Sequence, residues 1–182
     1  MGYDISSCMR SVQKFAFREL PLNVNSRKVI FGYLESATEL LDLHLRLCCR
    51  SRPLPDPTAS SLLSVGNVFR LRNLSLTELN IDGADLIALL SRCKSTLLKV
   101  SIVLVCVSGR DSDWRTVFDT LTLMPRLSQV ELKFIQQTIY DAADHHRNLD
   151  RLNSCTWYAV EGRDKLAAGL RELLAALPEV AN

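Results

Sequence analysis

The amino-acid sequence predicts an α/β protein in which strand–helix units stack into a short curved solenoid, with a parallel sheet inside and helices outside. Two observations lead to this prediction. A pattern of the form apolar-x-x-apolar-x-apolar recurs at spacings of 26 to 31 residues. Between its copies, apolar residues follow spacings of three and four, which are typical of an amphipathic helix. Because a single unit cannot bury its apolar face alone, we expect successive units to pack side by side.

Five copies of the apolar pattern predict five strands. Apolar and polar residues alternate at the end of each copy, which is typical of a strand with one buried face. Residues 155–160 continue the spacing and are predicted as a sixth strand, so the domain should contain about five to six repeats. The apolar positions of the five copies are Val12, Phe15 and Phe17; Leu40, Leu43 and Leu45; Leu71, Leu74 and Leu76; Leu97, Val100 and Ile102; and Leu127, Val130 and Leu132.

Helices are predicted between these strands. Asp82 is a suitable N-cap for the apolar residues that recur within residues 84–90. Ser112 likewise precedes the apolar residues that recur within residues 114–121, where a second helix is predicted. Two earlier helices, at residues 29–34 and 57–68, complete the prediction.

Two segments near the C-terminus depart from the repeat. Residues 136–154 contain many charged residues and few apolar ones, and we expect an insertion loop there. Residues 163–177 carry an apolar stripe that includes Leu166, Leu170 and Leu173, as in an amphipathic helix. We expect this helix to cap the end of the core.

The composition is that of one globular domain, which we expect to span residues 1–182. The chain is 47% hydrophobic, which excludes wholesale disorder. Its formal net charge of +2 is too small to indicate a nucleic-acid or membrane partner. The most apolar run, residues 97–107, is 11 residues long, whereas a membrane span needs about 20.

Cysteine usage indicates a reducing compartment. The cysteines lie scattered in apolar runs, no Cys-x-x-Cys pair occurs, and the first ten residues lack the apolar segment of a signal peptide. We therefore expect reduced core cysteines in a cytoplasmic or nuclear protein. The six residues are Cys8, Cys48, Cys49, Cys93, Cys106 and Cys155.

The pattern Leu-x-x-Leu-x-Leu, combined with helices at this period, resembles leucine-rich repeat proteins of the ribonuclease-inhibitor-like class. Several segments further resemble the degenerate repeats of fungal F-box proteins, and the resemblance covers about residues 12–134. It implies a horseshoe-shaped docking surface that usually selects the substrate of a ubiquitin ligase, although no F-box is evident in the sequence. The segments are Leu71-Arg-Asn-Leu-Ser-Leu, Asp82-Gly-Ala-Asp-Leu, Thr96-Leu-Leu-Lys-Val, Asp113-Trp-Arg-Thr-Val-Phe and Met124-Pro-Arg-Leu.

One position of the repeat departs from this family. Leucine-rich repeats usually place Asn or Cys at the ninth position, where it supports the turn that leaves the strand. Here only Cys48 conforms, so irregular repeats are expected. The ninth positions are Leu20, Cys48, Leu79, Val105 and Ile135.

The residues between the buried strand positions are predicted to form a concave binding face. Cations outnumber acids among them, so we expect a protein partner with a mildly acidic segment, and we assign no catalytic residue, cofactor or metal. The predicted face consists of Lys14, Arg18, Asp42, His44, Arg46, Asn73, Ser75, Thr77, Lys99, Ser101, Gln129, Glu131 and Lys133.

The function predicted from these features is a non-enzymatic protein-interaction module, and two alternatives remain open. One is a truncated structural remnant without activity. The other is a metal-dependent hydrolase that uses His145 and His146 with Asp141 and Asp144. A solvated loop is favoured over a metal site there, because adjacent histidines point apart.

A thiol nucleophile is also less favoured than a structural role. Cys48 and Cys49 follow a predicted strand that contains His44. A reactive thiol needs a lowered pKa and an orienting base, and small buried residues at the end of a strand are the simpler interpretation.

Overall fold

The computed structural model defines most of the predicted strand–helix units. The predicted helices at residues 29–34 and 57–68 lie outside the described residues, apart from Leu34, which is helical and buried. The residues described are 10–18, 34, 36–46, 70–108, 114–133, 135–140, 146–149 and 158–176.

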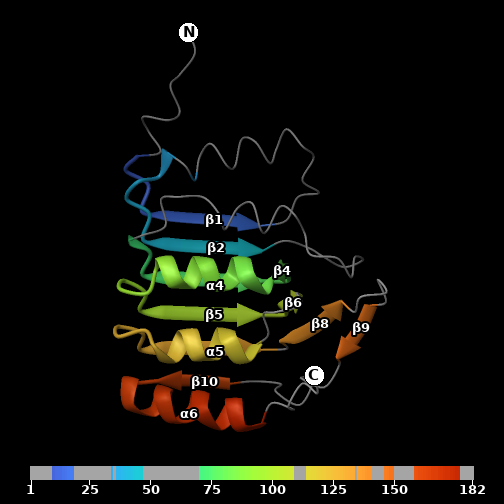
Figure 1. Cartoon of the computed structure of the whole chain (residues 1–182). Coiled ribbons are helices and arrows are strands. Elements are labelled where there is room, and N and C mark those ends of the chain that lie inside the picture. Colours follow the sequence, from blue (N-terminus) through green and yellow to red (C-terminus); the bar gives the residue numbers. More distant parts are fainter. Residues whose placement is uncertain are drawn as a thin grey trace.

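A six-stranded sheet forms the centre of the fold (Figure 1). The order of its strands is β1-β2-β3-β5-β7-β10, and the first five run parallel. These five strands coincide with the five predicted copies of the apolar pattern, which confirms an α/β fold with a parallel sheet. Their bounds are β1 Lys14–Arg18, β2 Asp42–Arg46, β3 Asn73–Thr77, β5 Lys99–Val103 and β7 Gln129–Lys133, and the last strand is β10 Tyr158–Glu161.

The register of the sheet aligns equivalent residues of successive copies. Leu74 pairs with Leu43 on one side and with Val100 on the other, and Leu76 pairs likewise with Leu45 and Ile102. All six side chains are almost completely buried. The apolar positions of the repeat therefore form two continuous columns across the sheet. We call them the core columns, because they are the contribution of the sheet to the hydrophobic core.

Backbone hydrogen bonds repeat in the same way where the strands begin. The carbonyl oxygen of Arg72 accepts from the N–H groups of Leu98 (2.8 Å) and Lys99 (3.0 Å). The same two-donor arrangement occurs at each of the other parallel strand pairs of this six-stranded sheet. There the acceptors are the carbonyls of Gln13, Leu41 and Leu98, and the donors are respectively Leu41 and Asp42, Arg72 and Asn73, and Ser128 and Gln129.

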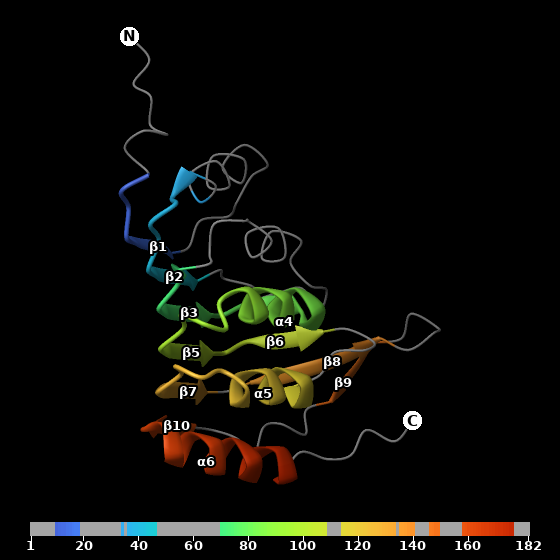
Figure 2. The same ribbon diagram turned by 60° about the vertical axis from the view of Figure 1, so that its left-hand side comes forward.

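The helices form one layer against the face of the sheet that carries the core columns (Figure 2). The Asp82 side chain caps α4 by accepting from the N–H of Ala84 at 2.8 Å, as predicted. Equivalent core residues of α4 and α5 lie 28 residues apart, for example Leu89 and Val117. Among the described residues, the helices are α4 Gly83–Arg92, α5 Trp114–Thr122 and α6 Arg163–Ala176, and α6 coincides closely with the helix predicted at residues 163–177.

A second, smaller sheet has the strand order β4-β6-β8-β9. Its strands β4, β6 and β8 come shortly after β3, β5 and β7 along the chain. The insertion loop predicted over residues 136–154 is wrong in part, because two of these strands lie within it. β8 continues the parallel ladder from β6 through backbone hydrogen bonds, and such bonds require no apolar alternation in the sequence. The strands are β4 Asn80–Asp82, β6 Cys106–Ser108, β8 Gln136–Tyr140 and β9 His146–Leu149.

The sixth strand of the main sheet also differs from the prediction. β10 pairs with β7 in antiparallel orientation, so it is not a further copy of the parallel repeat. The β8–β9 hairpin has already reversed the chain direction, so the chain enters the main sheet from the opposite end. Gly162, at φ 99°, then turns the chain into α6 while its N–H donates to the carbonyl of Ser128 at 2.9 Å.

A left-handed residue connects the two sheets in successive layers. Glu78 follows β3 and Leu104 follows β5, and both have φ 55°. The next residue in each layer, Leu79 or Val105, is buried, and so is Ile135 after β7. At the ninth position these three layers thus carry apolar residues, where the family resemblance implies Asn or Cys.

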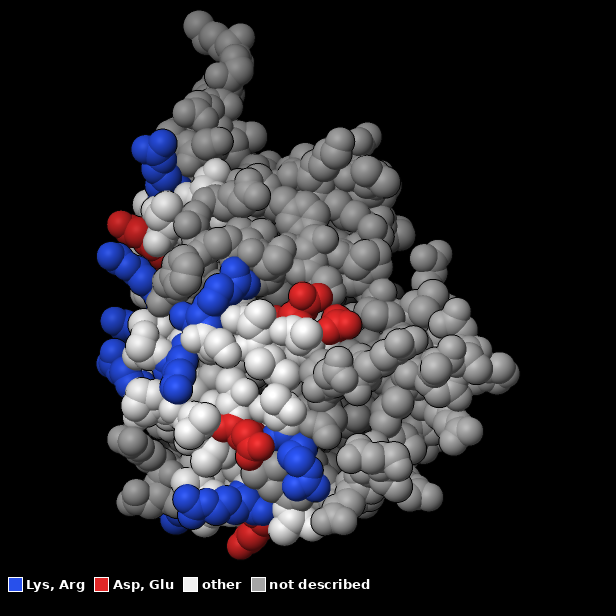
Figure 3. Space-filling model, in the orientation of Figure 1, with Lys and Arg blue, Asp and Glu red and all other residues white. Residues whose placement is uncertain are grey.

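Charged side chains are distributed unevenly between the two ends of the strands. Asp82 and Asp85 lie at the start of α4, on the side where the strands end. Lys and Arg side chains gather at the left of Figure 3, where the strands in Figure 1 begin. Among the described residues, the beginning of the strands is therefore mainly basic, whereas acids occur together with Arg18, Arg46 and Lys133 where the strands end.

Shortening Leu76 tests the core columns. Because Leu76 is fully buried between Leu45 and Ile102, Leu76→Ala should lower the free energy of unfolding by about 3 kcal/mol, measured by urea denaturation. Ser91→Ala, at an exposed position of α4, is the control and should change it by less than about 0.5 kcal/mol. Equal effects of the two substitutions would contradict the assignment.

Replacing Leu104 by glycine tests the left-handed turn. Glycine adopts φ 55° without steric cost, so Leu104→Gly should leave stability unchanged or raise it by up to about 1 kcal/mol, despite the loss of a half-exposed side chain. Val103→Gly, one residue earlier in β5, should instead destabilise the protein. Thermal unfolding of both variants measures the difference, and destabilisation of similar size in both would argue against strain at Leu104.

Candidate binding face

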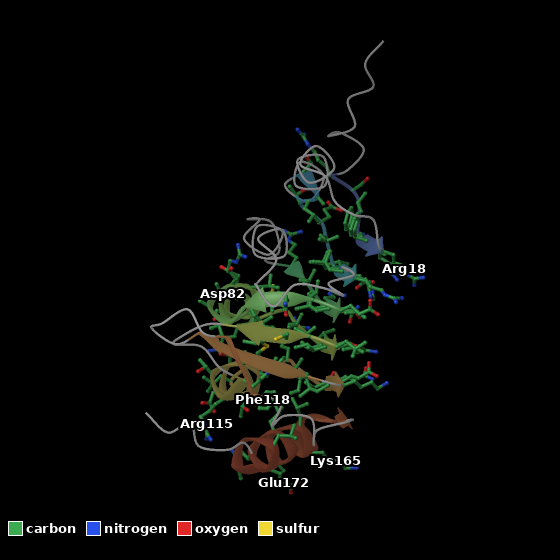
Figure 4. The ribbon with its side chains drawn as sticks, turned by 90° about the vertical axis from the view of Figure 1, so that its right-hand side faces the viewer. Arg18, Asp82, Arg115, Phe118, Lys165 and Glu172 are labelled. Carbon is green, nitrogen blue, oxygen red and sulfur yellow. The ribbon has the colours of Figure 1, made fainter. Side chains whose placement is uncertain are left out.

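The side of the main sheet away from the helices carries the polar strand residues. Figure 4 shows Arg18 on this side, whereas Arg115 and Lys165 lie with the helices. No described helix covers it. We call this surface the open face, and it brings together all the residues predicted to form the binding face. Across β1, β2, β3, β5 and β7 its three rows are Lys14, Asp42, Asn73, Lys99 and Gln129; Ala16, His44, Ser75, Ser101 and Glu131; and Arg18, Arg46, Thr77, Val103 and Lys133.

The open face contains a hollow of about 370 Å³. Ser75 and Ser101 are neighbours in the middle row, and their short side chains leave space between the larger His44 and Glu131. The hollow therefore results from side-chain size within one row of the sheet. Its lining residues are His44, Asn73, Leu74, Ser75, Lys99, Val100, Ser101, Gln129 and Glu131.

Asp42 lies in the first row and is only 8% exposed. Its Oδ2 atom lies 3.2 Å from Nζ of Lys14, and its Oδ1 accepts a hydrogen bond from Nδ2 of Asn73. Asp42 thus joins the first three strands through side chains, and its charge is compensated within the protein.

Glu131 closes the other end of the hollow. Its Oε1 lies 2.6 Å from Nζ of Lys133, and its Oε2 accepts a hydrogen bond of 2.8 Å from the hydroxyl of Ser101. The bond from Lys133, and then that from Ser101, hold the pKa of Glu131 below its ordinary value, because both stabilise the carboxylate. Glu131 is therefore ionised at neutral pH.

Glu78 is a charged neighbour of the open face that the sequence argument missed. Its Oε1 lies 2.9 Å from Nη2 of Arg46, and its other carboxylate oxygen is buried without a hydrogen-bond partner. The contact joins β2 to the residue after β3, at the left-handed turn. Glu78 comes one residue after Thr77, which is the register partner of Arg46, so the spacing of the repeat alone does not indicate the contact.

These ion pairs change the charge that the open face presents. Lys14, Arg46 and Lys133 are each paired with a carboxylate. Among the described residues, Arg18 and Lys99 form no such pair. Lys99 also lines the hollow, so the unpaired positive charge of this region is concentrated there.

The other candidate residues are not brought into a site by the described structure. Asp141, Asp144 and His145 lie outside the described residues, and so do Cys48 and Cys49. Within the described ranges, no group of His, Cys, Asp and Glu could hold a metal ion. Burial raises the pKa of the Cys93 thiol to about 11, so it is protonated and unreactive at neutral pH.

Comparison of the chain with protein-family models, with curated proteins and with solved structures gave no match. Over the part of the chain that the structure describes, none of the helices has the length and apolar character to cross a bilayer. The geometry of the open face is therefore the basis on which a function can be inferred.

Removing the two partners of Glu131 tests its electrostatics. Lys133→Met should raise its pKa toward 4.5 more than Ser101→Ala does, since the bond from Lys133 is the largest cause of the lowered value. The carboxylate stabilises the fold above pH 4.5, and this contribution is lost as the pH falls through the lowered pKa. NMR titration of the side-chain carboxyl measures both values.

The stability effect of these substitutions should be below about 1 kcal/mol, because the ion pair is partly exposed. Thr77→Ala, in the third row of the open face, is the control and should leave the pKa of Glu131 unchanged. An unshifted pKa in Lys133→Met would contradict the proposed cause.

Proposed function

We propose that the protein is a short leucine-rich-repeat-like solenoid that binds a protein partner on its open face without catalysing a reaction. Support comes from the in-register apolar columns and from the two-donor hydrogen bonds repeated at every parallel strand pair of the main sheet. Helices are about 10 Å wide, whereas strands are spaced about 4.8 Å apart. Stacking such units bends the sheet with the open face inside, so that it forms the concave side of a horseshoe.

The hollow between His44 and Glu131 is the observation that carries the binding proposal. A surface of parallel strands is rigid, so a partner loses little free energy by ordering it. Hydroxyl and amide groups line the hollow next to the ammonium group of Lys99. This combination favours an acidic side chain of a partner, held by Lys99 and by the Ser75 hydroxyl.

The electrostatics of the hollow favour binding over hydrolysis. Ser101 and Glu131 are hydrogen-bonded, which is the arrangement of a nucleophile and a base. However, a carboxylate with a lowered pKa is a weak base for a serine hydroxyl. In our proposal this pair therefore shapes the wall of the hollow.

The resemblance to fungal F-box proteins extends the proposal to substrate selection for a ubiquitin ligase. The partner on the open face would then be the protein to be modified, and contact with the ligase would need a separate element, since no F-box is evident. A cytoplasmic or nuclear location belongs to the same proposal. The free thiols of Cys93 and Cys106 are consistent with it.

Filling the hollow tests the proposed function. Ser75→Tyr places an aromatic side chain in the hollow and keeps the bonds of Glu131, and tyrosine is well tolerated in strands. We expect proteins recovered from source-cell extract by the tagged wild type to be reduced about tenfold with this variant. Quantitative mass spectrometry of the recovered proteins measures the change.

Ala88→Tyr, at an exposed position of α4, is the matched control and should recover the same proteins as the wild type. Thermal unfolding within a few degrees of wild type shows that both variants fold. Equal recovery by Ser75→Tyr and Ala88→Tyr would reject the open face as the binding surface and leave the structural-remnant alternative favoured.

A further inference from the structure

A second surface, distinct from the open face, lies where the parallel strands begin. Five exposed cations lie in the segments that lead into four of these strands. None of them forms an ion pair with another described residue. We call this surface the basic edge, and it consists of Arg10 before β1, Arg70 and Arg72 before β3, Lys94 before β5 and Arg126 before β7. The blue side chains at the left of Figure 3 lie along this side of the molecule.

Acidic residues are scarce on the basic edge. Glu39 is the single acid in the described segments that lead into the five parallel strands, which are residues 10–13, 36–41, 70–72, 93–98 and 123–128. At the opposite end of the strands acids and cations are mixed: Glu78, Asp82 and Asp85 lie there, and so do Arg18, Arg46 and Lys133. The positive charge of the basic edge is therefore local, although the whole chain has a formal net charge of only +2.

Helix dipoles explain only part of this charge. The C-terminal end of a helix favours nearby cations, and Lys94 follows α4 directly. However, α5 has no basic residue in its last turn, and Arg126 lies beyond the turn that follows it. Arg10 lies before β1 and Arg72 directly before β3, and neither residue follows the C-terminal end of a described helix. Most of the basic edge is thus free to serve another purpose.

The dimensions of the basic edge match a short extended peptide. From β1 to β7 the sheet has four strand-to-strand steps, which span about 19 Å at about 4.8 Å per step. An extended polypeptide rises about 3.3 Å per residue, so about six residues cover this length. Acidic side chains of such a segment would lie opposite successive layers of cations.

We infer that the basic edge binds an acidic, extended segment of a partner protein, independently of the open face. Charge complementarity is the main argument. The described segments of this edge contain no Phe, Tyr, Trp or His, so they offer no surface on which nucleic-acid bases could stack. Leu123 is 65% exposed in the same segment as Arg126 and provides an apolar contact for a protein partner.

The test measures binding of a fluorescently labelled glutamate octamer to the full chain by anisotropy, at low and at physiological salt. The wild type should bind it, and more weakly at the higher salt. Arg72→Glu/Arg126→Glu should weaken binding at least about tenfold. Arg115→Glu/Lys165→Glu is the matched control, because it changes the net charge equally on the helical side (Figure 4), and it should bind within about twofold of the wild type.

Two further arms separate this surface from its alternatives. Ser75→Tyr blocks the hollow, which in the proposed function also accepts an acidic side chain, so this variant separates the two surfaces. Octamer binding that persists in Ser75→Tyr and is lost in Arg72→Glu/Arg126→Glu belongs to the basic edge, whereas binding lost in Ser75→Tyr and kept in the glutamate double variant would overturn the inference without contradicting the proposed function. If the glutamate double variant fails to fold, Arg72→Gln/Arg126→Gln should still weaken binding. Absence of binding by the wild type, equal weakening by the control, or tighter binding of a labelled oligo-dT of equal charge would overturn the inference.

Discussion

The register of the parallel ladder is the constraint on which the other features depend. Side chains alternate between the two faces of a strand, so a shift of one residue would move Leu74 and Leu76 to solvent and Ser75 into the core. The paired N–H groups that share one carbonyl where each strand begins fix this register in every layer. The core columns, the polar rows and the hollow are therefore consequences of a single alignment.

The open face shows how such an alignment converts sequence into a defined surface. Residues about 30 positions apart become neighbours, and most of its charges are paired across strands or along one strand. Asp42 is the clearest case, since a buried carboxylate would be costly without Lys14 and Asn73 beside it. Among the described residues, the unpaired cations are Arg18 and Lys99 on the open face and, away from the hollow, those of the basic edge. The two surfaces differ in character, because the open face contains a hollow and cations that are mostly paired with carboxylates, whereas the cations of the basic edge form no ion pair with a described residue.

Much of this fold could be predicted from the sequence, because alternation and spacing are local properties. The five parallel strands, the capping of α4 by Asp82 and the placement of the polar rows follow from them. β8 and β9 were not predictable in this way, since Gln136 to Tyr140 lacks apolar alternation and pairs through its backbone. The antiparallel direction of β10 depends on that hairpin. The Arg46–Glu78 pair and the hollow depend on contacts between layers and on the sizes of neighbouring side chains, which spacing alone does not specify.

The position of the hollow within the sheet has a consequence for dynamics. Its lining comes from β2, β3, β5 and β7, each of which has a hydrogen-bonded strand on both sides. Amide protons in such strands exchange with solvent only when the sheet opens between layers, whereas an outermost strand can fray alone. A ligand seated there would contact the slowest-exchanging part of the molecule, and its residence time would be decoupled from local unfolding at the ends of the sheet.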